Sequence, residues 1–326
     1  MSTTPLGNNS SASANPSPDE SHLVSSDALS ARDGFRVGYV ALLGQTNVGK
    51  STFLNAVLRE KLLISSPKPQ ATRNRIRCIL TSGDEQIIFV DTPGIHRPRT
   101  KLGRQLVREA LRGLRGIDVL LYMIEPWGHV DALDRHTLDR LTDLDVPILL
   151  LVNKIDRARG NALEETLLAY HDLDRFEELI PISATKGIGL ADAVRTAASY
   201  LPVGEPIFSS DVRTDRSQEF HIEEIIREKV YQVAYQEVPY SAAVRTKWLR
   251  ESEQGLMEIK AEIMVERESQ KGILIGKRGE TIKRIGTTAR SEIEQLLKRK
   301  VFLELIVQVS PSWTRDEDQV RRETEA

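Results

Sequence analysis

The chain has 326 residues, of which 40% are hydrophobic and 28% charged, a composition that is ordinary for a globular protein of about two domains. Its formal net charge of −2 excludes recognition of a polyanion by bulk charge, so any basic surface must be local. The single cysteine, Cys78, excludes an intrachain disulfide and fits a reducing cytosol, and no stretch approaches the ~18 uninterrupted apolar residues of a membrane span.

The first 34 residues are expected to form a disordered N-terminal tail. The segment through Asp33 contains no lysine and one arginine, Arg32, and it is rich in Ser, Asn, Ala and Pro. It lacks the basic start and the apolar core of a signal peptide, and it has too few arginines for a mitochondrial import sequence. Such a composition is typical of disorder.

Apolar runs alternate with helical patterns from Phe35 onward. The runs predict buried strands at residues 36–43, 86–90, 119–124, 146–152 and 179–182, and the helical patterns include residues 50–58, 101–114 and 189–201. This alternation predicts an α/β domain over residues 35–204, with a mostly parallel sheet and helices on both faces. Ligands of such sheets bind at the carboxyl ends of the strands.

A phosphate-binding loop, Gly-Gln-Thr-Asn-Val-Gly-Lys-Ser, follows the first predicted strand. Gly44 and Gly49 allow the backbone to wrap phosphates with its N–H groups turned inward. Lys50 is expected to reach the β- and γ-phosphates, and the hydroxyl of Ser51 is expected to ligate Mg²⁺. The predicted phosphate contacts in this loop are Gly44, Asn47, Val48, Gly49, Lys50, Ser51 and Thr52.

A second motif, Asp91-Thr92-Pro93-Gly94, follows the next predicted strand. Asp91 is expected to hold Mg²⁺ from the far side through water, and the N–H of Gly94 to sense the γ-phosphate. Thr72 lies in a polar, Pro-containing stretch between residues 59 and 77, which suits a switch loop, and it is a further predicted ligand of Mg²⁺ and the γ-phosphate. The predicted catalytic residues are Lys50, Thr72 and Gly94.

Two further motifs, Asn153-Lys154-Ile155-Asp156 and Ser183-Ala184-Thr185, predict that the base is guanine. A carboxylate at Asp156 accepts hydrogen bonds from the guanine N1–H and exocyclic amine, a pair that adenine does not offer. Asn153 is expected to brace the loops and Lys154 to cover the base, while the N–H of Ala184 reaches O6. The order and spacing of the four motifs indicate a GTPase that hydrolyses GTP to GDP and phosphate.

Slow intrinsic hydrolysis is expected, because Ile95 stands where many GTPases place a glutamine that orients the attacking water. Asn47 offers a remedy, since its amide oxygen could help to bind K⁺ beside the phosphates. His96 is interpreted as a surface residue of the switch loop rather than as a base.

The periodicity stops at residues 202–216, and residues 205–216 are the predicted linker. A smaller α+β unit is predicted over residues 217–312: a helix at 220–236, strands at 242–250 and 255–267, a short helix, a helix to about 300 and a strand at 301–309. Residues 313–326 are expected to form a C-terminal tail.

A Gly-x-x-Gly loop lies between the last two predicted helices. Its glycines would let the backbone approach a nucleic-acid strand, and its basic side chains would meet phosphates. Residues 271–300 hold nine Lys or Arg and three Asp or Glu, a net charge of +6, so positive charge is concentrated here. The predicted RNA-binding residues are Ile275, Gly276, Lys277, Arg278, Gly279, Lys283 and Arg284.

Together with the switch run at residues 66–73, these motifs resemble the Era family of bacterial GTPases over about residues 35–312. The chain departs from the family pattern at Gln45-Thr46-Asn47, where Arg-Pro-Asn is usual, and at Ala71-Thr72-Arg73, where Thr-Thr-Arg is frequent. The resemblance implies a P-loop GTPase domain joined to a type II KH domain, with Mg²⁺ and GTP or GDP bound. It also implies binding near the 3′ end of small-subunit ribosomal RNA and a role in assembly of the small ribosomal subunit.

Two alternatives stay open at this point. A metabolic P-loop phosphotransferase is disfavoured by the Asn153–Asp156 motif, and a signalling or membrane-associated GTPase whose second domain binds protein or lipid is disfavoured by the Gly-x-x-Gly loop. We expect a cytoplasmic monomer without a transmembrane segment, while peripheral association with the inner membrane stays open.

Overall fold

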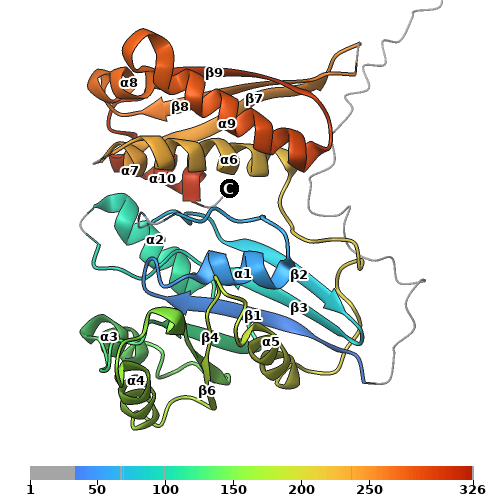
Figure 1. Ribbon diagram of the computed structural model, residues 1–326, viewed down its shortest axis with the longest axis vertical. Helices are drawn as coiled ribbons and strands as arrows, with labels where there is room; N and C mark the ends of the chain where they lie inside the picture. The colour runs from blue at the N-terminus through green and yellow to red at the C-terminus, as the bar shows by residue number, and fades with distance from the viewer. Residues whose placement is uncertain are drawn as a thin grey trace, which may run out of the picture.

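The computed structural model describes residues 34–324 except residues 67, 69, 99, 236 and 254. The expected N-terminal tail therefore lies outside the described residues, apart from Gly34. The described chain folds into two bodies, an α/β body below and a smaller α+β body above it (Figure 1). Among the described residues, none of the helices combines the length and apolarity that crossing a membrane requires.

A six-stranded sheet forms the centre of the lower body, in the order β2-β3-β1-β4-β5-β6. Neighbouring strands are parallel except β2, which runs antiparallel to β3. The predicted mostly parallel sheet is confirmed. The strands are β1 (Arg36–Gly44), β2 (Ile76–Ser82), β3 (Glu85–Asp91), β4 (Val119–Ile124), β5 (Ile148–Val152) and β6 (Glu178–Pro181).

Helices cover both faces of this sheet, as predicted. One core cluster joins the strands to α1 (Lys50–Leu58) and α5 (Leu190–Ser199) through residues such as Phe53 and Ala197. A second cluster contains Ala110, Leu138 and Tyr170 on the other face. Those residues belong to α2 (Lys101–Arg112), α3 (Ala132–Asp139) and α4 (Ala162–His171).

The upper body has a three-stranded sheet in the order β7-β8-β9, and its helices share one core cluster with the strands. Strands β8 and β9 are parallel, whereas β7 is antiparallel to β8. The predicted order of elements is confirmed except that a short helix, α7 (Val238–Ser241), precedes the first strand. The elements are α6 (Gln218–Val233), α7, β7 (Ala243–Glu251), β8 (Met257–Val265), α8 (Glu268–Ile275), η2 (Lys277–Gly279), α9 (Glu280–Leu297) and β9 (Val301–Val309).

The predicted linker packs along the lower body. The side-chain amide of Gln86 in β3 bonds to the carbonyl and the N–H of Phe208, at 2.7 and 2.9 Å, and Phe208 is buried. The N–H of Ile79 in β2 donates to the carbonyl of Arg213 at 2.8 Å. The connecting segment is thus attached to the edge of the sheet until α6 begins.

The C-terminal segment differs from the expected tail. Its described part forms η3 (Trp313–Arg315) and α10 (Glu317–Thr324), which lies between the two bodies in Figure 1. Trp313 is 1% exposed and joins a core cluster with Leu102 and Leu106 of α2 and with Ala243 of β7. Burial of this large ring gives the segment a fixed place, and the local sequence does not reveal it because the contacts are distant along the chain.

Candidate nucleotide site and RNA surface

The phosphate loop connects β1 to α1 and requires its glycines. A Cβ on Gly44, whose φ is 150°, would lie 2.2 Å from the carbonyl oxygen of Met123. A Cβ on Gly49, whose φ is 108°, would lie 2.2 Å from Nδ2 of Asn153. Any larger residue at either position would displace the neighbouring strand ends, so the loop holds its shape only with glycine.

Two opposite charges are buried at this loop. Lys50 is 6% exposed, and its Nζ donates to the carbonyls of Gly44 and Gln45 at 3.1 and 3.0 Å. Burial lowers the pKa of Lys50 to about 8 and raises the pKa of Asp91 to about 6, although the attraction between them opposes both shifts. Oδ1 of Asp91 has no hydrogen-bond partner among the described residues. A buried, unpaired carboxylate oxygen is costly unless a cation or donor meets it, which suits a metal site.

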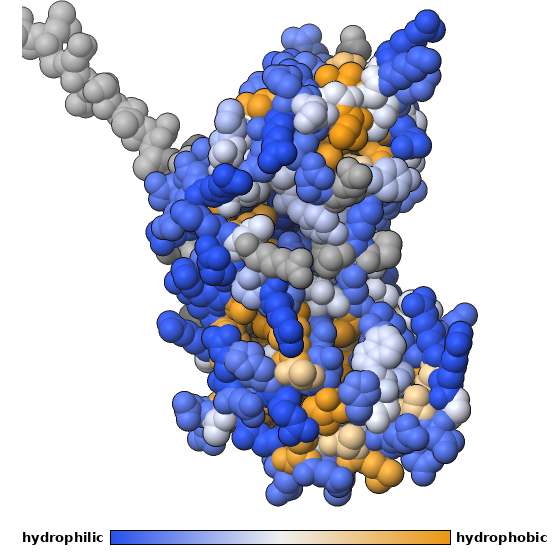
Figure 2. Space-filling view, turned by 90° about the vertical axis from the view of Figure 1, so that its left-hand side faces the viewer, coloured by the Kyte–Doolittle hydropathy of each residue, from blue (hydrophilic) through white to orange (hydrophobic). Residues whose placement is uncertain are grey.

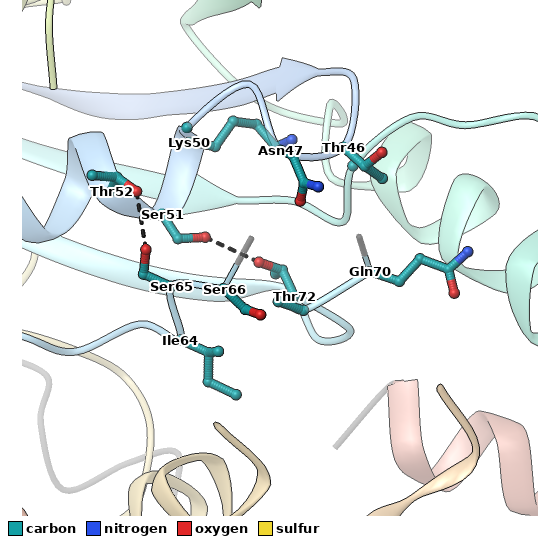
Figure 3. A pocket seen from close by; sticks show the side chains of 13 residues that line it. Thr46, Asn47, Lys50, Ser51, Thr52, Ile64, Ser65, Ser66, Gln70 and Thr72 are labelled. Atoms are coloured by element: carbon teal, nitrogen blue, oxygen red, sulfur yellow. Dashed lines mark hydrogen bonds between the residues drawn. The ribbon is translucent and has the colours of Figure 1, made fainter. Parts of the chain in front are cut away.

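The three predicted metal ligands lie together. Ser51 Oγ is 3.0 Å from Thr72 Oγ1 and 3.2 Å from Asp91 Oδ2, and Thr72 Oγ1 is 3.3 Å from the same carboxylate oxygen. Figure 3 shows the hydroxyls of Ser51 and Thr72 pointing toward one another across the pocket. Hydroxyl and carboxylate oxygens are hard donors that fit Mg²⁺. The site can therefore hold this ion between α1, the switch loop and the end of β3.

The second motif continues from β3 and lies against the phosphate loop. A Cβ on Gly94 would lie 2.7 Å from Cα of Thr46, so only glycine allows the two loops to lie this close together. The N–H of Ile95 donates to Gly44 O at 3.0 Å, and the N–H of Thr46 donates to Ile95 O at 3.1 Å. The Ile95 side chain is 4% exposed and belongs to the core beneath α2. It is turned away from the pocket and cannot orient a water there.

The predicted base-reading residues form a connected group at the strand ends. The hydroxyl of Ser183 donates to Asp156 Oδ1 at 2.5 Å, and this bond lowers the pKa of the exposed Asp156 carboxyl. Nδ2 of Asn153 donates to Val48 O at 2.7 Å, and Oδ1 of Asn153 accepts from the N–H of Ala184 at 3.0 Å. Asn153 thus joins the phosphate loop to the last motif, as its predicted bracing role requires.

Lys154 crosses the open side of the phosphate loop. Its Nζ donates to Asn47 O at 2.6 Å and pairs with Glu125 Oε1 at 2.6 Å. Glu125 was missed from the sequence because it follows β4 outside any motif. Thr52, a predicted phosphate contact, instead has its hydroxyl 3.1 Å from that of Ser65 in the switch loop (Figure 3).

His96 connects the two switch segments. The half-buried ring lies with Nδ1 2.9 Å from Gly94 O and Nε2 3.1 Å from Nε2 of Gln70. An imidazole that donates from Nδ1 and accepts at Nε2 satisfies both contacts. Gly94 is thereby linked to the loop that contains Thr72.

The switch loop also holds the upper body, a contact that sequence reasoning missed. Arg73 is 3% exposed, and its guanidinium donates to the carbonyls of Pro239, Tyr240 and Ala242 at 3.1, 2.9 and 2.8 Å. The ammonium of Lys68 donates to the carbonyls of Tyr231 and Ala234. These carbonyls lie at the C-terminal ends of α7 and α6, where orphan carbonyls and the helix dipole favour a cation.

The predicted RNA loop lies between α8 and α9. Gly276 has φ 73°, and a Cβ there would lie 2.2 Å from Thr281 Oγ1, whereas the position of Cβ at Gly279 is open space. The side chains of Lys277 and Arg278 are exposed, as are Lys283 and Arg284 at the start of α9, while Ile275 is partly buried beside them. A strand could therefore approach the backbone closely with four cations around it.

Two protein-family models match the chain. One, described as a 50S ribosome-binding GTPase, covers residues 39–154, and the other, a KH domain, covers residues 237–314. The KH match disfavours the alternative that the second body binds protein or lipid.

Curated relatives match over most of their length. GTPase Era of Geotalea uraniireducens (strain Rf4) is 46% identical over 282 residues, which are 86% of this chain and 95% of that protein. GTPase Era of Caldanaerobacter subterraneus subsp. tengcongensis is 43% identical over 289 residues, 88% of this chain and 97% of that protein.

Solved structures agree with these matches. Era in complex with MgGDPNP and nucleotides 1506–1542 of 16S ribosomal RNA has a TM-score of 0.84 at 39% identity, over 89% of this chain and 98% of that one. An Era variant of Aquifex aeolicus bound to GDP·AlF₄⁻ also gives 0.84 at 39% identity, over 88% and 98% of the two chains.

Proposed function

Because the chain belongs to the Era family of GTPases, we propose that it is a GTP-hydrolysing switch that binds small-subunit ribosomal RNA near its 3′ end and acts in small ribosomal subunit assembly. One observation carries the proposal. The loop that presents Thr72 to Ser51 and Asp91 also anchors the KH domain through Lys68 and Arg73. A nucleotide-sensing loop is thus attached directly to the RNA-binding domain.

At the phosphates, Lys50 neutralises charge on the β- and γ-groups, and the N–H of Gly94 donates to the γ-phosphate. Ser51, Thr72 and Asp91 would hold Mg²⁺, which lowers the repulsion that phosphoryl transfer must overcome. The approach of Gly94 to within van der Waals contact of the phosphate loop supports this assignment.

At the base, Asp156 accepts the two guanine donors, and Lys154 lies over the ring plane. The N–H of Ala184 donates to guanine O6, while Ser183 and Asn153 hold the loop that contains Ala184 in place. The low pKa of Asp156 supports this assignment, because the carboxyl must be ionised to accept both bonds at neutral pH.

Hydrolysis needs a substitute for the water-orienting glutamine, and we assign part of that role to K⁺ held through Asn47. Asn47 lines the pocket beside the phosphate loop (Figure 3), and its φ of 65° is one that asparagine tolerates. We expect GTP hydrolysis to be faster in K⁺ than in Na⁺ at equal ionic strength, and Asn47→Ala to remove the difference. Equal rates in the two salts for the unmodified protein would contradict the assignment.

The chain divides, in this proposal, into a GTPase domain at residues 35–204, a linker at 205–216 and a KH domain at 217–312. The separate sheets and core clusters of the two bodies support the division. We further propose a cytoplasmic monomer, because the proposed partner, the assembling small subunit, is found there.

The RNA assignment is tested by crosslinking GTP-loaded protein to cellular RNA and sequencing the bound fragments, with Gly279→Asp as the control variant. Space for the new carboxylate is open at position 279, although the φ of 78° there favours glycine, and its charge would repel phosphates. We expect fragments from the 3′ end of small-subunit ribosomal RNA to be enriched with the unmodified protein and not with the variant. If no RNA is enriched, the RNA half of the proposal is wrong and the GTPase half stands.

A further inference from the structure

Helix α2 carries a line of basic side chains on its solvent side. Basic residues recur at spacings of three and four, which place them along one face of the helix: Lys101, Arg104, Arg108 and Arg112. Arg115 follows in the turn after α2. Over residues 101–115 the one acidic residue is Glu109, so the net charge is +4 in a chain whose total is −2. The opposite side of the helix is apolar and buried through Leu102, Leu106 and Ala110.

Three of these cations make no ion pair with the described residues. Lys101 pairs with Glu317 at 3.4 Å, and Arg112 pairs with Glu109 at 2.8 Å. Arg104, Arg108 and Arg115 are exposed, and none of them makes an ion pair within the part of the chain that the structure describes. A face of unpaired arginines produces a local positive potential, and the guanidinium fork matches phosphate geometry.

Further cations lie next to these basic residues at the C-terminal end of α2. There, a pocket of about 200 Å³ is lined by Arg115 together with Arg75, at the end of the switch loop, and Arg77 of β2. Arg77 pairs with Asp215 at 3.7 Å, and its guanidinium lies 5.9 Å from the ring centroid of Tyr39. The exposed Arg75 adds positive charge where the helix ends.

At its other end, α2 adjoins the KH domain. A pocket of about 350 Å³ between the bodies is lined by Arg97 and Thr100 on one side and by Arg267 and Gln270 on the other. The last two residues begin α8, which leads into the Gly276–Gly279 loop. Figure 1 shows α2 and α8 on the same side of the molecule, and Figure 2 shows that side with a mostly hydrophilic surface. One surface thus connects the RNA loop to α2.

We propose that Arg104 and Arg108 of α2, together with Arg115 in the turn after it, form a second RNA contact, which binds the sugar-phosphate backbone of the RNA that the KH loop holds. The proposal rests on the proposed RNA-binding function. From Arg104 to Arg112, where α2 ends, the helix rises about 12 Å, the length over which a stacked nucleic-acid strand presents about three to four phosphates. The contact adds affinity without base recognition, since phosphates carry no sequence information.

The test compares two RNAs and two triple variants of the full chain. The long probe is an RNA of nucleotides 1506–1542 of 16S ribosomal RNA. The short probe is an RNA of about eight nucleotides from its 3′ end, enough for the four that a Gly-x-x-Gly loop clamps. The test variant is Arg104→Gln/Arg108→Gln/Arg115→Gln. The matched control is Arg135→Gln/Arg140→Gln/Arg159→Gln, three exposed arginines of the same domain around α3 and the start of α4. Fluorescence anisotropy gives each affinity over a range of salt.

We expect the test variant to bind the long RNA on the order of tenfold more weakly, with a salt slope smaller by about 2, because three phosphate contacts are lost. It should bind the short RNA and GTP like the unmodified protein, and the control variant should match the unmodified protein on both RNAs. Unchanged affinity and slope for the long RNA in the test variant would overturn the inference, as would an equal loss in the control variant. If the unmodified protein bound neither RNA, the proposed function itself would fail, which is a distinguishable result.

Discussion

Asp91 is a predicted ligand of Mg²⁺ and Lys50 a predicted contact of the GTP phosphates. Their pKa values lie on either side of neutrality. The Asp91 carboxyl, with a pKa of about 6, is protonated in acid and then competes with the metal, while Lys50, with a pKa of about 8, loses its charge in base. In the folded protein without ligands both side chains are therefore mainly charged at pH 7, but burial has brought each pKa close to that pH.

Nucleotide affinity should therefore depend on pH with a maximum between about pH 6 and 8 in the presence of Mg²⁺. Titration with a fluorescent GTP analogue measures it. With Mg²⁺ removed by a chelator, the acid limb should disappear because Asp91 no longer has a metal to bind, and the basic limb of Lys50 should remain. An affinity that stays flat from pH 5 to 9 would show that neither group titrates in the free site.

At the residue scale, we expect Asp156 to select guanine over other bases. Asp156→Asn replaces an acceptor with a group that offers one acceptor and one donor, so the amide meets guanine with a mismatched donor and matches xanthine better. We expect GTP affinity to fall by about 10²-fold or more and XTP affinity to rise, measured by competition binding. Ser183→Ala is a milder comparison, since it removes the hydrogen bond that stabilises the carboxylate. Unchanged GTP affinity in Asp156→Asn would refute the role.

The switch loop, residues 59–75, is the element that joins nucleotide and RNA domain. Arg73 follows Thr72 directly, and its guanidinium is the donor for three carbonyls at the end of α7. Tyr231 of α6 donates its hydroxyl to Gln70 O at 3.0 Å, so a second KH helix contacts the same loop. A change in Thr72 on loss of the γ-phosphate must therefore move or break these contacts.

Arg73→Gln should uncouple the domains, because it leaves buried carbonyls without donors, at a cost of about 1–3 kcal/mol each. We expect GTP affinity to stay close to that of the unmodified protein, while RNA affinity loses its dependence on the bound nucleotide. Lys61→Gln is the matched control. Lys61 also bridges the bodies, to Glu228 and Glu292 at 2.9 and 2.7 Å, but it is 45% exposed and such pairs contribute little. Intact nucleotide dependence in Arg73→Gln would contradict this coupling.

Elements that carry their own local signal could be predicted from the sequence. The strand 119–124 and the helix 50–58 have the predicted bounds, because an uninterrupted apolar run and a loop-to-helix motif mark their ends. β2 is absent from the predicted apolar runs, since this edge strand begins inside the stretch that reads as a switch loop and mixes Ile76 and Ile79 with polar residues. Its pairing with β3 depends on the distant segment around Arg213 as well as on its own pattern.

At the scale of the whole molecule, individual site residues could be predicted but the contact between the bodies could not. The motifs predict Ser51, Thr72 and Asp91 as neighbours, and the structure brings them together from the start of α1, the switch loop and the end of β3. Nothing local distinguishes Arg73 or Trp313 from ordinary loop residues. Their burial arises only when the KH domain lies on the GTPase domain, where Trp313 Nε1 donates to Ser241 O at 2.7 Å.

We expect the arrangement of the two bodies to determine which nucleotide state binds RNA. With Thr72 facing Ser51 and Asp91, the KH domain is attached to the switch loop and the Lys277–Arg278 turn is exposed. A triphosphate with Mg²⁺ stabilises that position of Thr72, so it should favour RNA binding, and by linkage RNA should favour the triphosphate to the same extent.

The most direct test is the affinity of the full chain for an RNA of nucleotides 1506–1542 of 16S ribosomal RNA, measured with Mg²⁺ and either a non-hydrolysable GTP analogue or GDP. We predict binding that is at least about fivefold tighter with the GTP analogue, the lower end of typical coupling between two sites. Equal affinity in the two nucleotide states would contradict the account of this protein as a GTP-controlled RNA switch.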